Sequence, residues 1–211
     1  MKGNLIIISS PSGGGKGTLI KEVLKIVPNI DYSVSFTTRE MRVGEENGID
    51  YFFVSRAEFE NLIEKGEFLE FAEVHGNFYG TSINQVKNKI DSGQDVVLEI
   101  DVQGAESVRR SMPEAVNIFI LPPSFEVLRN RLKARATEKL KDLELRLRNS
   151  FAEIRRVGEF EYVVINDDVS EATADLRTII LVERLKRIRQ IEAIQGILDS
   201  FDTSKISSLG D

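Results

Sequence analysis

A lysine inside a glycine-rich turn is the residue of this sequence whose surroundings most clearly suggest chemistry. The stretch SSPSGGGKGT, from Ser9 to Thr18, contains four glycines and comes directly after the apolar run NLIIIS. Glycines allow backbone angles that other residues avoid, so such a loop can turn its N–H groups toward a ligand. A helix that opens at the lysine adds the unpaired N–H groups of its first turn, which attract phosphate oxygens. The stretch therefore predicts a phosphate-binding loop made by Ser12, Gly13, Gly14, Gly15, Lys16, Gly17 and Thr18.

This loop departs from the common pattern G-x-x-x-x-G-K-[ST] at two positions. Ser10 stands in the place of the first glycine, and Gly17 stands where a serine or threonine normally binds Mg²⁺. Because glycine has no hydroxyl group, a direct protein ligand to the metal is in doubt, with Thr18 one position late. The alternative interpretation is an ordinary glycine-rich turn between a strand and a helix.

Two arginines form a second candidate site for an anion. Arg39 and Arg42 lie in the polar stretch SVSFTTREMRVGEENGIDY, between the hydroxyl groups of Ser35 and Tyr51. Guanidinium groups bind phosphate oxygens through paired, charge-assisted hydrogen bonds, so these arginines are suited to a second phosphate group. Further along, FLEFAEVHGNFYGTS places a carboxylate on one expected strand and hydroxyl groups on the next, at Glu70, Tyr79 and Thr81.

The elements that must position these residues read as an α/β fold. Short, apolar and β-branched runs predict buried parallel strands, at Asn4–Ser9, Asp95–Asp101, Ala115–Leu121 and Glu161–Asn166. Helical patterns lie between them, at Thr18–Val27, Ala105–Met112, Phe125–Leu132 and from about Glu171 onward. Strands that alternate with helices predict a parallel sheet with helices on both faces.

Two segments differ from this alternating pattern. Residues 35–82 contain short aromatic strands (49–54, 67–74 and 77–82) and one amphipathic helix (55–66), which predicts a small mixed insertion. Residues 131–149 are dense in charge and predict a mobile, mostly helical lid. The expected boundaries are a core from 1–34, 83–130 and 150–200, the insertion 35–82, the lid 131–149 and a flexible tail 201–211.

The composition narrows the class of protein. A chain of 211 residues favours one domain with inserted parts. The formal charge of −6 argues against a general nucleic-acid binder. No apolar run approaches the roughly 20 residues that span a membrane, and the apolar patch at the start is too short for a signal peptide. The absence of cysteine from the sequence is consistent with a reducing cytoplasm.

Taken together, the motifs resemble those of the bacterial guanylate kinases, which are nucleoside monophosphate kinases of the P-loop class. The resemblance runs from about residue 4 to residue 185 and rests on motifs in the same order: SSPSGGGKGT, SVSFTTREMRVGEENGIDYFFV, FLEFAEVHGNFYGTS, VLEIDVQGA and VINDD. It implies a cytoplasmic enzyme of purine metabolism that transfers the γ-phosphoryl group of ATP to GMP or dGMP, with Mg²⁺. The implied fold is a parallel core that carries a GMP-binding insertion and a lid.

The resemblance also implies roles in binding GMP. The GMP phosphate would be held by Arg39, Arg42, Tyr51 and Tyr79, and the guanine by Ser35, Glu70 and Thr81. Guanine presents N1–H and N2–H₂ donors side by side, and an ionised carboxylate offers two parallel acceptors. Adenine lacks this donor pair and would leave a buried carboxylate unpaired, so hydrogen bonding should set the choice of base. Two further acids at the end of a core strand, Glu99 and Asp101, are expected near the acceptor nucleotide.

For the transfer itself, the resemblance implies that Lys16 and three lid arginines are the catalytic residues. These arginines are Arg131, Arg135 and Arg146. Arg131 and Arg135 would share one face of a helix. Asp101 would lie near Mg²⁺ and act through metal-bound water, and the side-chain amide of Asn166 would contact the adenine of ATP. Ala136 stands where a glycine is expected, so the lid hinge could sit elsewhere. His75 is given no role.

Two other functions remain open from the sequence alone. A guanylate-kinase-like scaffold domain would keep the fold and bind phosphorylated peptides, but such domains have a degraded phosphate loop, whereas Lys16 is present. A kinase of the same fold for another small acceptor would not be expected to carry Ser35, Glu70 and Thr81 together. The partners are therefore expected to be small nucleotides, with no nucleic acid or membrane. An apolar stripe at Leu181, Leu185, Ile188, Ile191, Ile194 and Leu198 is explained by core packing or by a dimer contact, so the protein is a monomer or a homodimer.

Overall fold

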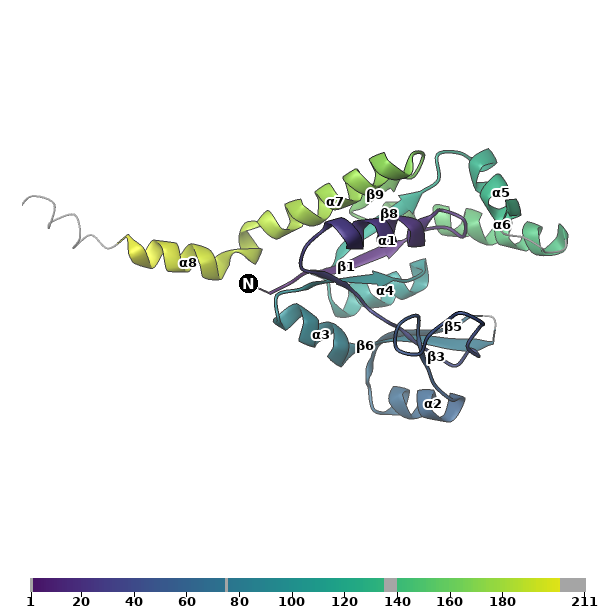
Figure 1. Ribbon diagram of the computed structural model, residues 1–211, viewed down its shortest axis with the longest axis horizontal. Coiled ribbons are helices and arrows are strands. Elements are labelled where there is room, and N and C mark those ends of the chain that lie inside the picture. Colours follow the sequence, from purple (N-terminus) through teal and green to yellow (C-terminus); the bar gives the residue numbers. More distant parts are fainter. Residues whose placement is uncertain (1, 75, 135–139, 202–211) are drawn as a thin grey trace, which may run out of the picture.

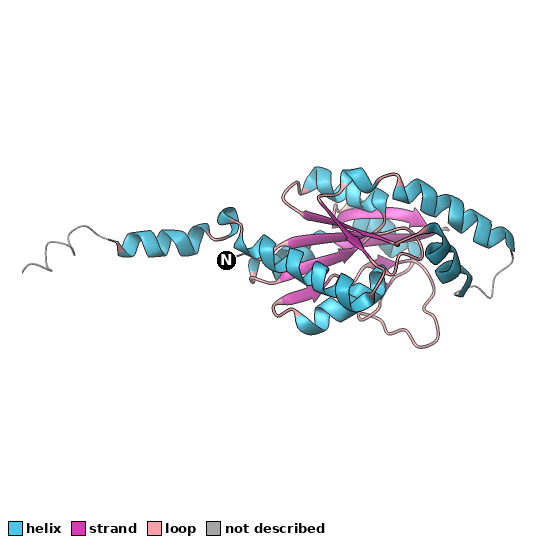
Figure 2. Ribbon diagram, turned by 90° about the horizontal axis from the view of Figure 1, so that it is seen from above, coloured by secondary structure: helices cyan, strands magenta, loops and turns pink. Residues whose placement is uncertain are grey.

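The computed structural model describes residues 2–74, 76–134 and 140–201. Its centre is a parallel sheet of five strands in the order β2-β7-β1-β8-β9. The strands are β1 (Leu5–Ser9), β2 (Ile30–Tyr32), β7 (Asp95–Glu99), β8 (Val116–Leu121) and β9 (Tyr162–Ile165). Figure 2 shows this sheet with helices on both sides. The predicted α/β fold with a parallel sheet is confirmed.

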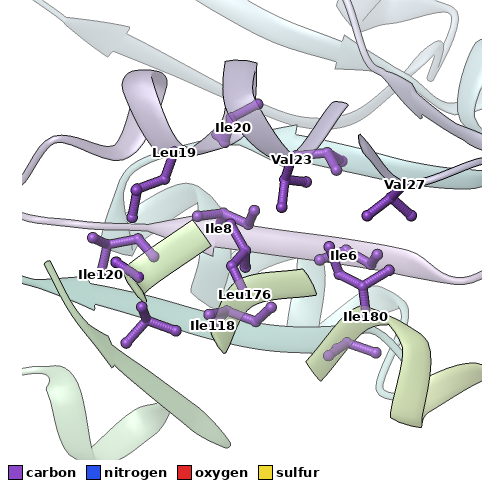
Figure 3. Close-up of a cluster of buried hydrophobic side chains, with 14 residues drawn as sticks. Ile6, Ile8, Leu19, Ile20, Val23, Val27, Ile118, Ile120, Leu176 and Ile180 are labelled. Atoms are coloured by element: carbon purple, nitrogen blue, oxygen red, sulfur yellow. The ribbon is translucent and has the colours of Figure 1, made fainter. Parts of the chain in front are cut away.

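Each face of the sheet has its own apolar core. On one face, isoleucines and valines of the strands pack against α1 (Lys16–Ile26) and α7 (Val169–Leu185), as Figure 3 shows. On the other face, α3 (Ile83–Asp91) and α4 (Val102–Ser111) cover a second cluster. Successive side chains of a strand point to opposite faces, and helices cover both faces, so the strands must be apolar throughout.

A second, smaller sheet has the order β4-β3-β6-β5. Its strands are β3 (Phe36–Thr37), β4 (Phe52–Phe53), β5 (Phe68–Val74) and β6 (Asn77–Ser82). One side is covered by α2 (Arg56–Glu64), whose fully buried Phe59 stacks on the rings of Phe68 and Phe78, with centroids 4.5 and 5.3 Å away. Figure 1 shows this unit beneath the parallel sheet. The strand expected at 49–54 is shorter than predicted, and β3 was not predicted.

Two helices lie beyond the carboxyl end of the parallel sheet (Figure 1). They are α5 (Phe125–Ala134) and α6 (Leu140–Ile154), and the rings of Phe125 and Phe151 lie 5.6 Å apart between them. A short 3₁₀ turn, Val157–Glu159, leads from α6 to β9. Arg135 and Ala136 of the predicted lid, and His75, lie outside the described residues.

The long C-terminal helix expected from about Glu171 is interrupted. After α7, Lys186 adopts an extended backbone (ψ 131°), a 3₁₀ turn follows at Arg187–Arg189, and α8 (Ile191–Ser200) begins. Figures 1 and 2 show α8 projecting away from the rest of the molecule, and none of its residues is buried. Core packing therefore does not explain the C-terminal part of the apolar stripe, since Leu185, Ile188, Ile191 and Leu198 are all exposed. Among the described residues, no helix is both long and apolar enough to cross a membrane.

Candidate functional site

The glycine-rich loop joins β1 to α1, and two of the three consecutive glycines have the special backbone angles that were predicted for all three. Gly13 (φ +83°) and Gly15 (φ +88°) adopt left-handed backbone conformations, and Gly15 is the residue that precedes the helix. Helix α1 begins at Lys16, slightly before the expected start at Thr18. A cavity of about 260 Å³ lies over the loop. It is lined by Ser10, Pro11, Ser12, Gly13, Gly14, Gly15, Lys16, Gly17, Glu99, Asp101 and Glu153.

Lys16 points from the first turn of α1 toward the carboxyl end of the sheet. Its Nζ donates a hydrogen bond to the Ile100 carbonyl oxygen at 3.0 Å, and the carboxylate of Glu99 lies 4.0 Å away. The Ser9 hydroxyl donates to the same carbonyl at 2.8 Å. Burial lowers the pKa of Lys16, because desolvation disfavours its charged form, while Glu99 acts in the opposite direction. The loop thus holds a cation whose stabilisation depends on nearby anions.

Asn166 braces the loop from the end of β9. Its Nδ2 donates to the Gly14 carbonyl oxygen at 2.9 Å, and its own backbone carbonyl accepts from Arg131 Nη2 at 2.9 Å. From the sequence, Asn166 was expected only to contact the adenine of ATP, so its contact with the loop was missed. The Oδ1 of Asn166 and the Nη1 of Arg131 are buried and have no hydrogen-bond partner. These groups keep an acceptor and a donor available beside the loop.

A second cavity, of about 390 Å³, lies between the two sheets. It is lined by Lys16, Tyr32, Ser35, Tyr51, Glu70, Ala72, Tyr79, Glu99, Ile100, Asp101 and Glu153. Its most unusual group is the carboxylate of Glu70, which is buried and accepts a hydrogen bond from the Thr81 hydroxyl at 2.6 Å. Burial raises the pKa of Glu70 to about 7, with a further rise from Asp101, while the Thr81 hydrogen bond opposes the rise.

A β-bulge explains how Glu70 comes to face this cavity. The pairing of β5 with β6 shifts between Phe68 and Glu70, so that Phe68 lies opposite Ser82 and Glu70 lies opposite Thr81. In a regular strand, residues 68 and 70 would point to the same face. The extra residue in the bulge reverses the alternation, so Phe68 packs on α2 while Glu70 turns to the opposite face. The sequence predicted the two strands but not this change of phase.

The arginine cluster is partly assembled. Arg39 is paired with the Glu45 carboxylate at 2.8 Å and lies over the ring of Tyr51, 5.3 Å from its centroid. Tyr79 interacts electrostatically with Arg39, and the rings of Tyr51 and Tyr79 are 5.9 Å apart. Arg42 is exposed in the loop, and its backbone N–H donates to Glu45 at 2.8 Å. The structure therefore brings Arg39, Tyr51 and Tyr79 together, and it pairs Arg39 with Glu45, a residue that was not expected in the site from the sequence.

Three acids surround Lys16. Glu99 ends β7 and accepts a hydrogen bond from the Tyr32 hydroxyl at 3.4 Å. Asp101 caps α4: its Oδ1 accepts from the backbone N–H groups of Gln103 (3.0 Å) and Gly104 (2.7 Å). Glu153 reaches the loop from α6, and its pKa is raised by burial.

Tyr32 and Glu153 were both missed from the sequence. Tyr32 ends a strand of three residues, and Glu153 lies in a helix rich in charge, so neither position gave a local signal.

Gly104 explains how Glu70 and Asp101 approach each other. A Cβ atom at Gly104 would lie 3.1 Å from Glu70 Oε2 and 3.4 Å from Asp101 Oδ1, so a side chain there would press on the carboxylate of Glu70.

The arrangement can hold two anionic ligands side by side. Lys16, Glu99, Asp101 and Glu153 line both cavities, which therefore meet at the lysine. Of the lid arginines, Arg131 on α5 lies beside the loop and Arg146 is on α6. Within the described part of the chain, no group of three or more His, Cys, Asp or Glu residues could hold a metal ion.

Comparisons with known proteins identify the family of the chain. The guanylate kinase family model matches residues 2–183. The chain is 50% identical to the guanylate kinase of Neisseria gonorrhoeae over 199 residues, which cover 94% of this chain and 97% of that protein. It is 45% identical to the guanylate kinase of Carboxydothermus hydrogenoformans over 185 residues, 88% of this chain and 91% of that protein. The crystal structure of guanylate kinase from Anaplasma phagocytophilum covers 95% of each chain with a TM-score of 0.78 and 36% identity.

Proposed function

The chain belongs to the guanylate kinase family and transfers a phosphoryl group from ATP to GMP, and we propose that the two cavities that meet at Lys16 hold these substrates face to face. The observation that carries this proposal is that one lysine lines both cavities. Two ligands bound in them would have their reacting ends next to each other. Phosphoryl transfer depends mainly on such alignment and on neutralising charge.

The donor nucleotide is assigned to the glycine-rich loop. Backbone N–H groups of the loop would bind the phosphates of ATP, and Lys16 would exchange the Ile100 carbonyl for phosphate oxygens. The hydroxyl of Thr18 would also bind the phosphates. The backbone N–H groups would come from Ser12, Gly13, Gly14, Gly15 and Gly17. The buried Oδ1 of Asn166 supports a contact with the amino group of adenine, because it is an acceptor that lacks a donor.

The acceptor nucleotide is assigned to the cavity that contains Glu70. The ionised carboxylate of Glu70 would accept the N1–H and N2–H₂ donors of guanine, with Ser35 and Thr81 as further polar contacts. Arg39, Arg42, Tyr51 and Tyr79 would bind the phosphate, which would take the place of the Glu45 carboxylate beside Arg39. Glu99 and Asp101 lie on the side of this cavity nearest Lys16. The burial of Glu70 supports strong selectivity, because another base would leave it unpaired.

The site is suited to a Mg²⁺ ion that arrives with ATP. Carboxylate oxygens are hard ligands of the kind that Mg²⁺ prefers, and Glu99 and Asp101 lie beside the loop, but among the described residues no group of three acids forms a direct metal site. Gly17 offers no hydroxyl, and Asp101 Oδ1 already caps α4. We therefore place Asp101 near the ion through water, with phosphate oxygens as the direct ligands. The ion would neutralise charge on the phosphates.

The lid is assigned to the transferring group. Arg131 and Arg146, together with Arg135 outside the described residues, would neutralise charge that develops on the phosphoryl group as it moves. Arg131 already lies beside the loop through its bond to Asn166. The proposed boundaries remain core 1–34, 83–130 and 150–200, GMP-binding insertion 35–82, lid 131–149 and tail 201–211.

Three further points of the proposal concern the setting of the enzyme. The absence of cysteine supports a cytoplasmic enzyme. The net charge of −6 supports small nucleotides rather than nucleic acid as partners. The exposed apolar side chains of α8 leave both a monomer and a homodimer open.

An assay of ADP formation with five possible acceptors tests the proposal. GMP and dGMP should support turnover, whereas AMP, CMP and UMP should not. Equal turnover with AMP would contradict the role of Glu70. ATP binding without turnover on any nucleoside monophosphate would contradict the placement of GMP in the cavity that contains Glu70.

A further inference from the structure

Glu153 links the lid helix α6 to the phosphate loop. Its Oε2 accepts a hydrogen bond from the Ser12 backbone N–H at 3.0 Å. About one turn earlier on the same helix, the hydroxyl of the fully buried Ser150 lies 2.9 Å from the Arg146 carbonyl oxygen and 3.2 Å from the Ser12 carbonyl oxygen, so its one proton is shared between the two. Helix α6 therefore engages both backbone polar groups of one loop residue, which fixes the helix against the loop.

The carboxylate of Glu153 occupies part of the space that phosphates need. It lines the cavity over the loop together with Gly13, Gly14 and Lys16. A carboxylate oxygen accepts a backbone N–H much as a phosphate oxygen does, because both are anionic acceptors. The Ser12 N–H cannot serve both groups fully at once. A phosphate chain on this loop must therefore compete with Glu153.

We propose that Glu153 is a positioning residue that stands in for phosphate in the nucleotide-free enzyme and that ATP displaces it from the Ser12 N–H. The inference rests on the proposed placement of ATP at this loop. Displacement removes one of the two links between α6 and the loop. Arg146 lies seven residues before Glu153, about two turns earlier on the same side of α6. Arrival of ATP thereby loosens the attachment of the helix that carries Arg146, the arginine assigned above to the transferring group.

A single substitution separates charge from shape. Glu153→Gln keeps the length of the side chain and one oxygen acceptor for Ser12, but it removes the negative charge that faces the triphosphate. Two unit charges a few ångströms apart near a protein surface interact strongly enough to change affinity about tenfold or more. Glu144→Gln is the matched control, since Glu144 is on the same helix, exposed, and paired with Arg148 rather than with the loop.

Calorimetric titration with ATP, with and without Mg²⁺, tests the proposal. Glu153→Gln should bind ATP about tenfold more tightly than wild type under both conditions, while GMP binding stays unchanged. Glu144→Gln should match wild type. In steady-state assays the KM for ATP should fall and the KM for GMP should not. Unchanged or weaker ATP binding by Glu153→Gln overturns the proposal; weakening confined to Mg²⁺-containing buffer would mean that Glu153 serves the metal instead.

Two further measurements keep the test decisive. Lys16→Met separates the inference from the proposed function. If Lys16→Met binds ATP like wild type, the proposed placement of ATP at the loop is wrong. If Lys16→Met loses ATP binding while Glu153→Gln shows no increase in ATP affinity, only the displacement of Glu153 is refuted. Hydrogen–deuterium exchange of the wild-type enzyme needs no variant that might misfold. Saturating ATP should change exchange at residues 150–154 and GMP should not. No change with ATP overturns the displacement.

Discussion

The side chain of Asn166 fills the space beside Gly15. A Cβ atom at Gly15 would lie 2.2 Å from Asn166 Nδ2, the same atom that donates to the Gly14 carbonyl oxygen. The glycine is therefore required twice, by this close approach and by its left-handed backbone (φ +88°). Two segments far apart in the sequence, residues 15 and 166, fix the shape of the loop together.

Gly15→Ala should distort the loop. A side chain there either displaces Asn166 or strains the backbone, so we expect a loss of unfolding free energy of about 1–3 kcal/mol and a clear rise in the KM for ATP. Urea denaturation and steady-state assays measure both. Gly158→Ala is the control, because a Cβ atom at Gly158 has no neighbour within 4 Å. Equal behaviour of the two variants would contradict the tight packing at Gly15.

Lys16→Met should lose catalysis without losing the fold. The ammonium is held in a desolvated site, so its removal costs little stability, whereas the charge that faces the phosphates is lost. We expect turnover to fall by about 10²- to 10³-fold or more. Thermal unfolding should remain near wild type. Lys21→Met, on the exposed side of the same helix, should keep full turnover. A slow Lys21→Met would indicate a general effect of helix charge.

Glu70→Gln should weaken the choice of base. The amide presents one acceptor and one donor where guanine needs two acceptors, so the KM for GMP should rise by about 10²-fold. The KM for ATP should change little. The ratio of kcat/KM for GMP to that for AMP is the decisive measurement. Thr81→Val provides a milder comparison, since it removes the hydroxyl bond to Glu70 but keeps the carboxylate. Wild-type selectivity in Glu70→Gln would refute base reading by this residue.

Binding of the guanine base should weaken as the pH falls. The pKa of Glu70 is raised to about 7 in the nucleotide-free protein, and guanine needs the ionised form. Affinity should thus be complete well above pH 7 and fall about tenfold per unit below it. Calorimetry with guanosine isolates this effect, because guanosine has no phosphate that titrates near pH 6. The profile should be flat in Glu70→Gln; a sloping profile in that variant would assign the titration to another group.

The same carboxylate should make the empty enzyme less stable at higher pH. Its pKa lies above the ordinary value of 4.5, so the folded state binds more protons than the unfolded state between about pH 4.5 and 7. The contribution of Glu70 is present below this window and is lost as the pH rises through 7. Denaturant unfolding of wild type and Glu70→Gln at pH 5 and pH 8 measures the difference. Relative to wild type, Glu70→Gln should gain stability from pH 5 to pH 8. The opposite change would be inconsistent with a destabilised carboxylate.

The sequence was most informative where a feature depends on neighbouring residues. The apolar run before the loop, the glycines and Lys16 specify β1, the loop and the start of α1 with little help from distant parts of the chain. By contrast, β2 is three residues long and only half-buried, and α3 buries one residue fully, Val86, so their patterns were too weak to predict.

The part of the site that was missed depends on long-range contacts. Glu153 reaches Ser12 across the fold, and Asn166, the residue after β9, supports Gly14. Neither contact leaves a periodic pattern in the sequence. The bulge before Glu70 is a similar case, because the order of residues does not reveal where one strand slips against its partner. The residue types of the site could be predicted, but the contacts that hold them in place could not.

The bond between Lys16 and the Ile100 carbonyl has a consequence for how quickly a nucleotide can be captured. The Lys16 ammonium is already largely desolvated in the folded chain, and its hydrogen bond to the Ile100 carbonyl oxygen holds the side chain in one position. Under the proposed function, an incoming triphosphate would replace the carbonyl oxygen as the partner of Lys16 and would not first have to dehydrate a mobile ammonium group. The conformational entropy of the Lys16 side chain is therefore lost when the chain folds, and little further rearrangement is needed when the nucleotide binds.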